Sequence, residues 1–498
     1  MNICLINPES TLKKNKSNLA LDNLEVGYMA AVLNDYVDRI DIFDMDVSLI
    51  DFDTIINVVL HNKYTIIGIF LYHYNHYNAV RLINKLKKKS NDFHIVVGGY
   101  YPTLHYEELL ENIDGIDYCI VGEPEFIMKD LIHSLDNNIP LNKIKGLAYI
   151  KNKEVIFNGR RGAIKDIDVL PFPIRVENKN YAPMIVSRGC YENCIFCVMR
   201  KFSSTFQGFL RKRSVTNVID EMEYLSKFGV RKVYFVDNNL LFCQGGRYEH
   251  WVKIFCEELK KRELDISYCS YARPKDIILQ KEYLPSLKST GLEKLNVEVQ
   301  NFDPKTIRYY KKDTTLSENV EALQLLAENN ILYSVLMIIF HPTVTIKEIL
   351  NNLLIFKEIQ FYEKAHITQT PLTCFPPLFP LRDTYFYDLL LKSPHQYSYY
   401  INGDYFFCYN GVNDLYKIII KWKAIIMNVE QTFFENKKNT CISNGENLLN
   451  IKSKVLKLDL LFFINACELM LKGECPVQLQ KRLINKWNDK LQEIINEK

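Results

Sequence analysis

The sequence contains no apolar run long enough to cross a lipid bilayer. Its most apolar stretches, such as Val335 to Phe340 and Leu460 to Ala466, are far shorter than the roughly 20 residues that a membrane-spanning helix needs. Residues 1–5 include no basic segment leading into a long apolar run, so no signal peptide is expected. An excess of charge of one sign is also lacking, because 62 Lys and Arg stand against 59 Asp and Glu. We therefore expect a cytoplasmic protein with neither nucleic acid nor membrane as a partner.

Cysteine pairs of the kind that build disulfide frameworks are missing as well. The chain has 13 cysteines. An odd number without a secretory signal favours reduced thiols. Ten of the cysteines are scattered singly, and the other three lie within eight residues, at Cys190, Cys194 and Cys197. That cluster requires an explanation of its own.

The length and composition predict a globular protein of about three domains. Of the 498 residues, 48% are hydrophobic and 24% are charged, which is an ordinary globular balance. Residues 1–145 alternate short apolar runs with amphipathic stretches, a pattern typical of a parallel sheet covered by helices on both faces. The predicted strands are Ile3–Ile6, Ile40–Phe43, Thr65–Phe70, His94–Val97 and Tyr118–Val121.

A second α/β segment is predicted after a short connection. Residues 146–180 read as a small hairpin, Gly146–Ile150 with Glu154–Asn158, followed by a linker that contains Pro171 and Pro173. From 181 to 382 the alternation restarts, and six strand-like runs predict a partial (β/α)6 barrel of the TIM type. The runs are Met184–Val186, Lys232–Val236, Ile266–Ser270, Lys294–Val299, Tyr333–Phe340 and Ala365–Thr368.

The last segment, residues 383–498, is predicted to be a helical domain. Apolar residues recur at helical spacing, with Lys and Glu between them. The expected helices are Asp414–Asn436, Leu448–Leu471 and Val477–Glu497.

The three clustered cysteines follow the first predicted barrel strand, where the catalytic residues of such folds lie. Three residues separate Cys190 from Cys194, and two separate Cys194 from Cys197. Three thiolates on a four-iron cluster leave one iron open for a ligand. Zinc held with a remote histidine, or simple packed thiols, are the alternatives for cysteines taken by themselves.

With Phe196 just before the last cysteine, this segment resembles the signature of the radical S-adenosylmethionine (SAM) superfamily. The resemblance implies a [4Fe–4S] cluster on Cys190, Cys194 and Cys197, with SAM bound to the open iron and Phe196 near the adenine. It also implies an external electron donor such as flavodoxin or ferredoxin. The reduced cluster would cleave SAM to methionine and a 5′-deoxyadenosyl radical.

Later strands carry further similarity to that superfamily. The segments around Asp237, Arg273 and Glu298 resemble strands that contact SAM, and these three side chains are expected SAM ligands. The alternative is structural: Asp237 could cap a helix, and Arg273 could pair with a carboxylate. Residues 338–342 depart from the usual Gly-x-Pro of the fifth strand.

The first domain resembles the cobalamin-binding domain that precedes many radical SAM domains. Gly98-Gly99 and Gly122-Glu123 lie at predicted strand ends, and the resemblance implies that they and Thr103 surround the cofactor. Glycines there let a corrin macrocycle or its nucleotide tail approach the backbone. The Asp-x-His-x-x-Gly motif of other cobalamin proteins is absent, and His73 and His76 are expected to be surface loop residues.

Together these resemblances predict a cobalamin-dependent radical SAM methyltransferase. It would act on an unactivated carbon of a peptide or natural-product substrate, with methylcobalamin as the methyl donor. A non-methylating rearrangement, cyclisation or bond formation is the leading alternative, and a non-catalytic iron–sulfur sensor is a further one. Methylthiotransferases need three more cysteines in the first domain, which has only Cys4 and Cys119. The aromatic-rich stretch Tyr397 to Tyr409 is a candidate substrate wall or a part of the core.

Overall fold

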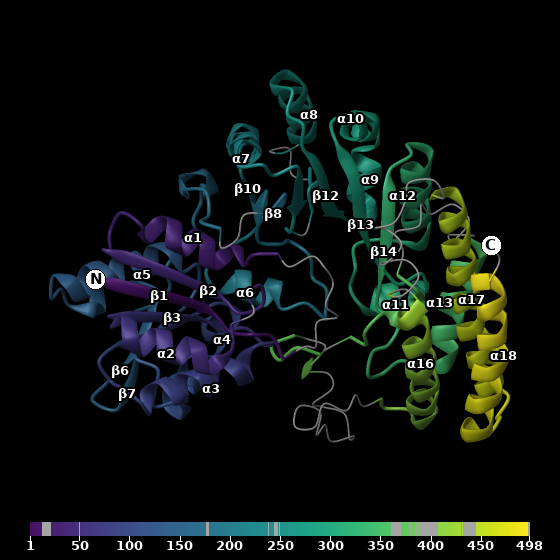
Figure 1. Cartoon of the computed structure of the whole chain (residues 1–498), viewed down its shortest axis with the longest axis horizontal. Coiled ribbons are helices and arrows are strands. Elements are labelled where there is room, and N and C mark those ends of the chain that lie inside the picture. The colour runs from purple at the N-terminus through teal and green to yellow at the C-terminus, as the bar shows by residue number, and fades with distance from the viewer. Residues whose placement is uncertain are drawn as a thin grey trace. The chain divides into compact units, whose positions relative to one another are not determined.

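The structure is a computed structural model. The chain divides into two compact units (Figure 1). The first comprises residues 1–191, 198–238 and 257–266, and the second comprises residues 192–197, 239–256 and 267–498. Within the described residues, no helix combines the length and apolarity needed to cross a membrane. The described residues are 1–11, 21–48, 50–175, 179–237, 239–243, 248, 250–359, 370–378, 380–384, 387–388, 407–429, 431 and 445–496.

The first unit contains a seven-stranded sheet with the order β2-β1-β3-β4-β5-β6-β7. Its first five strands are parallel, as their near-continuous apolar sequences predicted. The predicted bounds agree with the structure to within one residue. The strands are β1 (Asn2–Asn7), β2 (Arg39–Asp44), β3 (Ile66–Phe70), β4 (His94–Gly98) and β5 (Tyr118–Ile120).

Helices cover both faces of this sheet (Figure 1). Apolar residues of α2, α3 and α4 pack in one core cluster with the strands, and those of α1 and α5 pack in another. This division confirms the expected three-layer arrangement. The helices are α1 (Leu24–Leu33), α2 (Phe52–Asn62), α3 (His76–Lys87), α4 (Tyr100–Asn112) and α5 (Glu125–Asp136).

The hairpin of β6 (Leu147–Lys151) and β7 (Glu154–Phe157) forms where the sequence predicted it. It is not a separate element, because β6 pairs antiparallel with β5 and extends the sheet. Asn152 and Lys153 both have positive φ at the turn, as two-residue hairpin turns require.

The first unit also holds the beginning of the second α/β segment. Strand β8 (Tyr181–Met184) pairs in parallel with β11 (Lys232–Phe235), and the short strands β9 (Ser187–Arg188) and β10 (Arg211–Lys212) pair antiparallel. The predicted strand over residues 184–186 is wrong in its bounds. β8 ends at Met184, and the Val186 N–H donates to the Asp237 side chain instead of to a neighbouring strand. The helices here are α6 (Met199–Thr205) and α7 (Val215–Lys227), while α8 (Trp251–Arg262) has residues in both units.

The second unit continues the β/α alternation. Strand β13 pairs in parallel with β12 and with β14. Two helices begin with reciprocal capping boxes, Thr315 with Glu318 and Thr345 with Glu348. The sixth predicted strand, Ala365–Thr368, lies outside the described residues. The elements are β12 (Ser267–Ala272), α9 (Pro274–Leu279), α10 (Leu284–Ser289), β13 (Leu292–Gln300), α11 (Pro304–Tyr309), α12 (Leu316–Glu328), β14 (Leu332–Met337) and α13 (Ile346–Glu358).

Three helices form the described part of the C-terminal segment, as predicted. They are α16 (Asn410–Val429), α17 (Gly445–Leu471) and α18 (Pro476–Asn496). Trp422 of α16 stacks on Phe462 of α17 with ring centroids 4.3 Å apart. Most of the aromatic-rich stretch from Tyr397 to Tyr409 lies outside the described residues, but Phe407 is fully buried.

Candidate functional site

The three clustered cysteines lie in the loop that follows β9. Within the described residues Cys190, Cys194 and Cys197 form no disulfide, and all three are partly exposed. Gly189 leads into the loop with φ +89°, and a Cβ built there would lie 2.5 Å from the carbonyl oxygen of Gly208. The backbone therefore needs glycine at this position. Three accessible thiols on one short loop fit an iron–sulfur cluster, whose protein ligands are thiolates.

Asp237 fixes the segment that precedes the cysteine loop. Its Oδ1 accepts from the Val186 N–H at 2.9 Å, and its Oδ2 accepts from the Ser187 hydroxyl at 2.6 Å. Burial raises the pKa of the Asp237 carboxyl, whereas the hydrogen bond from Ser187 lowers it. Asp237 lies just after β11, so it connects the end of that strand to the start of the cysteine loop.

Arg273 is engaged by two carboxylates of the second unit. Its Nη1 donates to Glu192, which lies between Cys190 and Cys194. Its Nε and Nη2 donate to Asp276 Oδ2 at 2.7 and 2.5 Å. The guanidinium thus pairs with carboxylates, as the structural alternative held, and one of them belongs to the cysteine loop.

Phe196 and Glu298 also belong to the second unit. The Phe196 ring packs edge-on against Tyr310, with ring centroids 5.4 Å apart, and the Ile195 N–H donates to the Tyr310 carbonyl. Glu298 Oε2 lies 3.4 Å from the Lys312 ammonium nitrogen. The two contacts with Tyr310 anchor the C-terminal half of the cysteine loop.

The predicted corrin-binding glycines are held together by one hydroxyl. Thr103 Oγ1 donates to the Gly99 carbonyl at 2.8 Å and accepts from the Gly122 N–H at 3.0 Å. Gly98 ends β4, and Gly99 follows it with φ +111°. A Cβ on Gly99 would lie 2.8 Å from the Leu71 carbonyl oxygen. The carboxyl ends of strands β4 and β5 therefore bring together Gly98, Gly99, Thr103 and Gly122.

The Glu123 carboxylate accepts hydrogen bonds from other residues of the chain. Arg211 donates to its two carboxylate oxygens at 2.9 and 3.0 Å, and the Ile164 N–H donates to Oε2 at 2.7 Å. Arg188 Nη1 lies 3.6 Å from Oε1. These bonds tie the loop after β5 to the β9–β10 hairpin.

A cavity of about 330 Å³ lies entirely within the first unit. We call it the Gly122 cavity. Its volume is in the range of ligand pockets, and both glycine loops and the residues that lead to the cysteine loop contribute to its wall. The lining includes Gly99, Gly122, Glu125, Arg188, Gly189 and Asp237.

The sequence analysis missed several polar residues of this wall. Glu125 Oε1 accepts from Arg188 Nη2 at 2.6 Å, and Glu25 accepts from the Tyr72 hydroxyl at 2.6 Å. Burial raises the pKa of the Glu25 carboxyl, and the Tyr72 hydrogen bond lowers it. Glu125 and Arg188 are 63 residues apart, so no local pattern could reveal their pairing.

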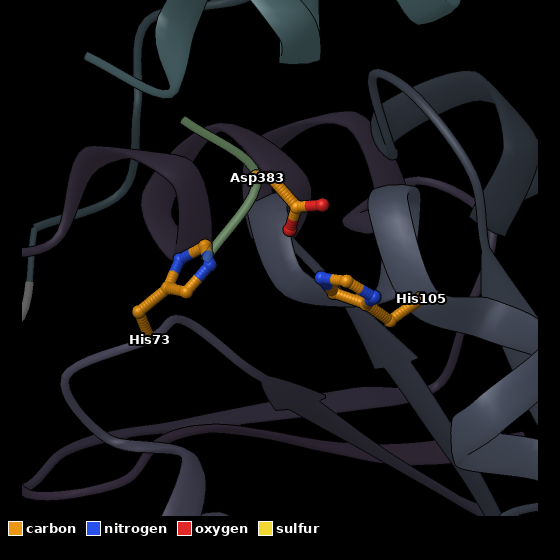
Figure 2. A group of neighbouring side chains, drawn as sticks. All are labelled: His73, His105 and Asp383. Carbon is orange, nitrogen blue, oxygen red and sulfur yellow. The ribbon is translucent and has the colours of Figure 1, made fainter. Parts of the chain in front are cut away.

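The two histidines expected on the surface pack instead against Tyr101. His73 and His76 are partly buried, with ring centroids 5.2 and 4.5 Å from that of Tyr101. His105 lies 4.5 Å from the same ring, and Figure 2 shows His73 and His105. Asp383, also drawn there, belongs to the second unit. The histidines thus contribute to packing against α4.

Comparisons with known proteins agree with this arrangement. Residues 15–132 match the B12 binding domain, and residues 184–354 match the radical SAM superfamily. An anaerobic magnesium-protoporphyrin IX monomethyl ester cyclase from Synechocystis sp. is 26% identical over 62% of this chain and 60% of its own. The chain covers between about half and two-thirds of the length of three curated relatives that it matches.

Two solved structures share the fold. The cobalamin-dependent radical SAM enzyme OxsB, with aqua-cobalamin and SAM bound, superposes with a TM-score of 0.78 at 16% identity, covering 100% of this chain and 80% of its own. The radical SAM methyltransferase TsrM from Kitasatospora setae, with tryptophan and a SAM analogue, gives 0.57 at 16% identity, covering 72% and 71%. A cobalamin domain followed by a radical SAM domain implies a [4Fe–4S] cluster, SAM and cobalamin as cofactors. The chain thus combines a B12 binding domain with a domain of the radical SAM superfamily.

Proposed function

We propose that this enzyme transfers a methyl group to an unactivated carbon of a small natural product or a peptide. The observation that carries the proposal is the wall of the Gly122 cavity. Gly99 and Gly122 belong to the cobalamin domain, whereas Arg188, Gly189 and Asp237 belong to the segment that leads into the cysteine loop. A methyl carrier bound at the glycines would therefore lie beside the residues that orient SAM.

The residues of this chain fit the cofactors of the family. Cys190, Cys194 and Cys197 would ligate the cluster, and Gly98, Gly99 and Gly122 would allow a corrin close to the backbone while Thr103 holds their loops together. Asp237, Phe196, Arg273 and Glu298 remain proposed SAM-site residues. Asp237 would act by orienting Ser187, and Arg273 by fixing the loop through Glu192.

When bound, the reduced cluster supplies the electron that cleaves SAM to methionine and a 5′-deoxyadenosyl radical, and cobalamin carries the methyl group. The protein orients these groups and excludes water and oxygen. Flavodoxin or ferredoxin is the proposed electron donor, and the cytoplasm is the proposed location. We also propose domain bounds of 1–145, 146–180 for the hairpin and linker, 181–382 and 383–498.

A non-methylating radical reaction is the second candidate. It is favoured by the similarity to a cyclase over 62% of the chain, whereas the structural similarity to TsrM favours methyl transfer. The two reactions differ in their use of SAM. Methylation consumes one SAM as methyl donor and another as radical source, so that it forms both S-adenosylhomocysteine and 5′-deoxyadenosine.

The test measures both products from the anaerobically reconstituted enzyme with cobalamin, a chemical reductant and SAM carrying a deuterated methyl group. Methyl transfer predicts S-adenosylhomocysteine with cobalamin present and little without it. Cys197→Ala is the control. It should abolish 5′-deoxyadenosine formation, while transfer of the deuterated methyl group from SAM to cobalamin persists. Formation of 5′-deoxyadenosine alone would contradict methyl transfer and favour the non-methylating reaction.

A further inference from the structure

The Gly122 cavity has polar atoms in its wall that the protein leaves unpaired. Glu125 is only 1% exposed, and within the described residues its Oε2 has no hydrogen-bond partner. Tyr28 is 2% exposed, and its buried hydroxyl is likewise unpaired within that part of the chain. Both residues line the cavity. An unpaired buried polar atom is costly, and such atoms at a ligand cavity indicate a ligand that completes their hydrogen bonds.

The charges of the wall restrict what that ligand can be. Glu25, Glu123, Glu125 and Asp237 line the cavity together with the cations Arg188 and Arg211. Carboxylate oxygens accept hydrogen bonds and do not donate them. A ligand group at Glu125 Oε2 must therefore be an N–H or O–H donor, and a ligand carboxylate there would be repelled. The peripheral side chains of a corrin such as cobalamin are amides, which offer neutral N–H donors.

The second oxygen of Glu125 contacts the segment that leads into the cysteine loop. Oε1 accepts from Arg188 Nη2 at 2.6 Å, and Arg188 is two residues before Cys190. Arg188 Nη1 also lies 3.6 Å from Glu123 Oε1, so two buried carboxylates hold the guanidinium in place.

The antiparallel β9–β10 strand pair that carries Arg188 is held by contacts at both strands. Arg188 faces Arg211 across the antiparallel β9–β10 pair, and Arg211 is held by Glu123. The tight backbone contact of Gly189 fixes the next residue. A shift at Glu125 is thus transmitted through Arg188 to Gly189, the residue directly before Cys190.

We propose that Glu125 is a positioning residue that couples corrinoid binding in the Gly122 cavity to retention of the cluster. One oxygen accepts an N–H from a corrin amide side chain, and the other holds Arg188 at the start of the cysteine loop. This inference rests on the proposed binding of cobalamin. Because coupling between sites is reciprocal, a bound corrinoid slows iron loss, and a bound cluster tightens corrinoid binding.

The test measures the rate of iron release to a ferrous chelator from the anaerobically reconstituted full chain, with and without saturating hydroxocobalamin. Bound corrin is quantified in each sample by its absorption. In the unmodified protein we expect bound hydroxocobalamin to slow iron release about five-fold or more, the lower end of typical couplings. In Glu125→Gln, we expect the same rate of iron release with and without saturating hydroxocobalamin.

Two further variants separate this effect from a loss of folding. Glu221 is a buried carboxylate that pairs with Arg213 and Arg175 and does not line the cavity. Glu221→Gln should keep the protection by hydroxocobalamin. Arg188→Lys keeps the charge but loses the fork that reaches both Glu123 and Glu125, so it should lose the protection.

The outcomes distinguish this proposal from the proposed function. Bound hydroxocobalamin that leaves the iron-release rate of the unmodified protein unchanged overturns the coupling alone. Failure of the protein to bind corrin overturns both. A third arm adds SAM without corrinoid. Protection by SAM that depends on Glu125 would assign the hydrogen-bond donor to SAM and overturn the corrinoid assignment.

Discussion

Arg273 forms an ion pair with Glu192, the residue midway between Cys190 and Cys194. The same guanidinium donates to Asp276, which is fully buried. Through these bonds the end of β12 holds the cysteine loop. Arg273 is therefore placed to position the cysteine loop, and its contact with SAM stays a prediction.

Substitution of Arg273 should destabilise the cluster loop. Lysine cannot span Glu192 and Asp276 together, because it lacks the planar fork of arginine. Breaking a buried ion pair from one side costs about 3–5 kcal/mol. We expect Arg273→Lys to lower both Tm and the iron bound per chain after reconstitution. Glu192→Gln, which keeps an acceptor on the loop, is the matched variant and should lose less iron. Full iron content in Arg273→Lys would show that the pair does not hold the loop.

The Thr103 hydroxyl should matter more than its methyl group. Thr103→Val keeps the shape but leaves the buried Gly122 N–H without its partner, at a cost of about 1–3 kcal/mol. Thr103→Ser keeps the hydroxyl. Denaturant unfolding of the two variants measures the difference. If Thr103→Ser lowers the free energy of unfolding as much as Thr103→Val does, the hydroxyl does not bridge the two loops.

The two glycines at the cavity should differ in their tolerance of a side chain. Both have φ near +111°, so alanine is strained at either position by about 1–3 kcal/mol. At Gly99 the new Cβ also meets backbone oxygen at 2.8 Å, whereas at Gly122 the nearest atom, on Phe206, is 3.6 Å away. We expect Gly99→Ala to lose more stability than Gly122→Ala in thermal unfolding. The reverse order would mean that the two loops are not shaped as described.

The sequence predicted elements well wherever local pattern determines them. The five parallel strands and the β6–β7 hairpin follow from apolar runs and turn residues. The pairing of β6 with β5 was not predicted, because it depends on tertiary contacts. Strand β8 was misplaced since Asp237, 51 residues later, takes the N–H of Val186.

The polar network of the site was harder to predict for the same reason. Glu123 was assigned to the cofactor because it follows β5. Its bonds to Arg211, 88 residues away, are visible only in the folded structure. Spacing identified the cysteines, but no spacing rule connects Glu125 to Arg188.

Stability should fall as pH rises through the titration of Asp459. Burial raises the pKa of this carboxyl to about 6, and hydrogen bonds from Thr373 and Trp422 oppose the rise. The ordinary value in an unfolded chain is about 3.9. The folded state therefore retains a proton between these two values and loses stability as pH rises from about 4 to about 6. The loss amounts to about 3 kcal/mol.

Asp459→Asn removes this titration and should flatten that part of the profile. The comparison is the free energy of unfolding of both proteins at several pH values between 4 and 7. The difference between them should change by about 3 kcal/mol across the window. A constant difference would mean that the buried carboxyl does not titrate there.

Cobalamin binding tests the central claim most directly. The protein is reconstituted anaerobically with iron and sulfide, mixed with hydroxocobalamin and freed of excess. Bound corrin is then quantified by absorption and mass spectrometry. We predict one corrin per chain, in a protein that also cleaves SAM. A protein whose cluster cleaves SAM but which retains no corrin would contradict cobalamin-dependent methyl transfer.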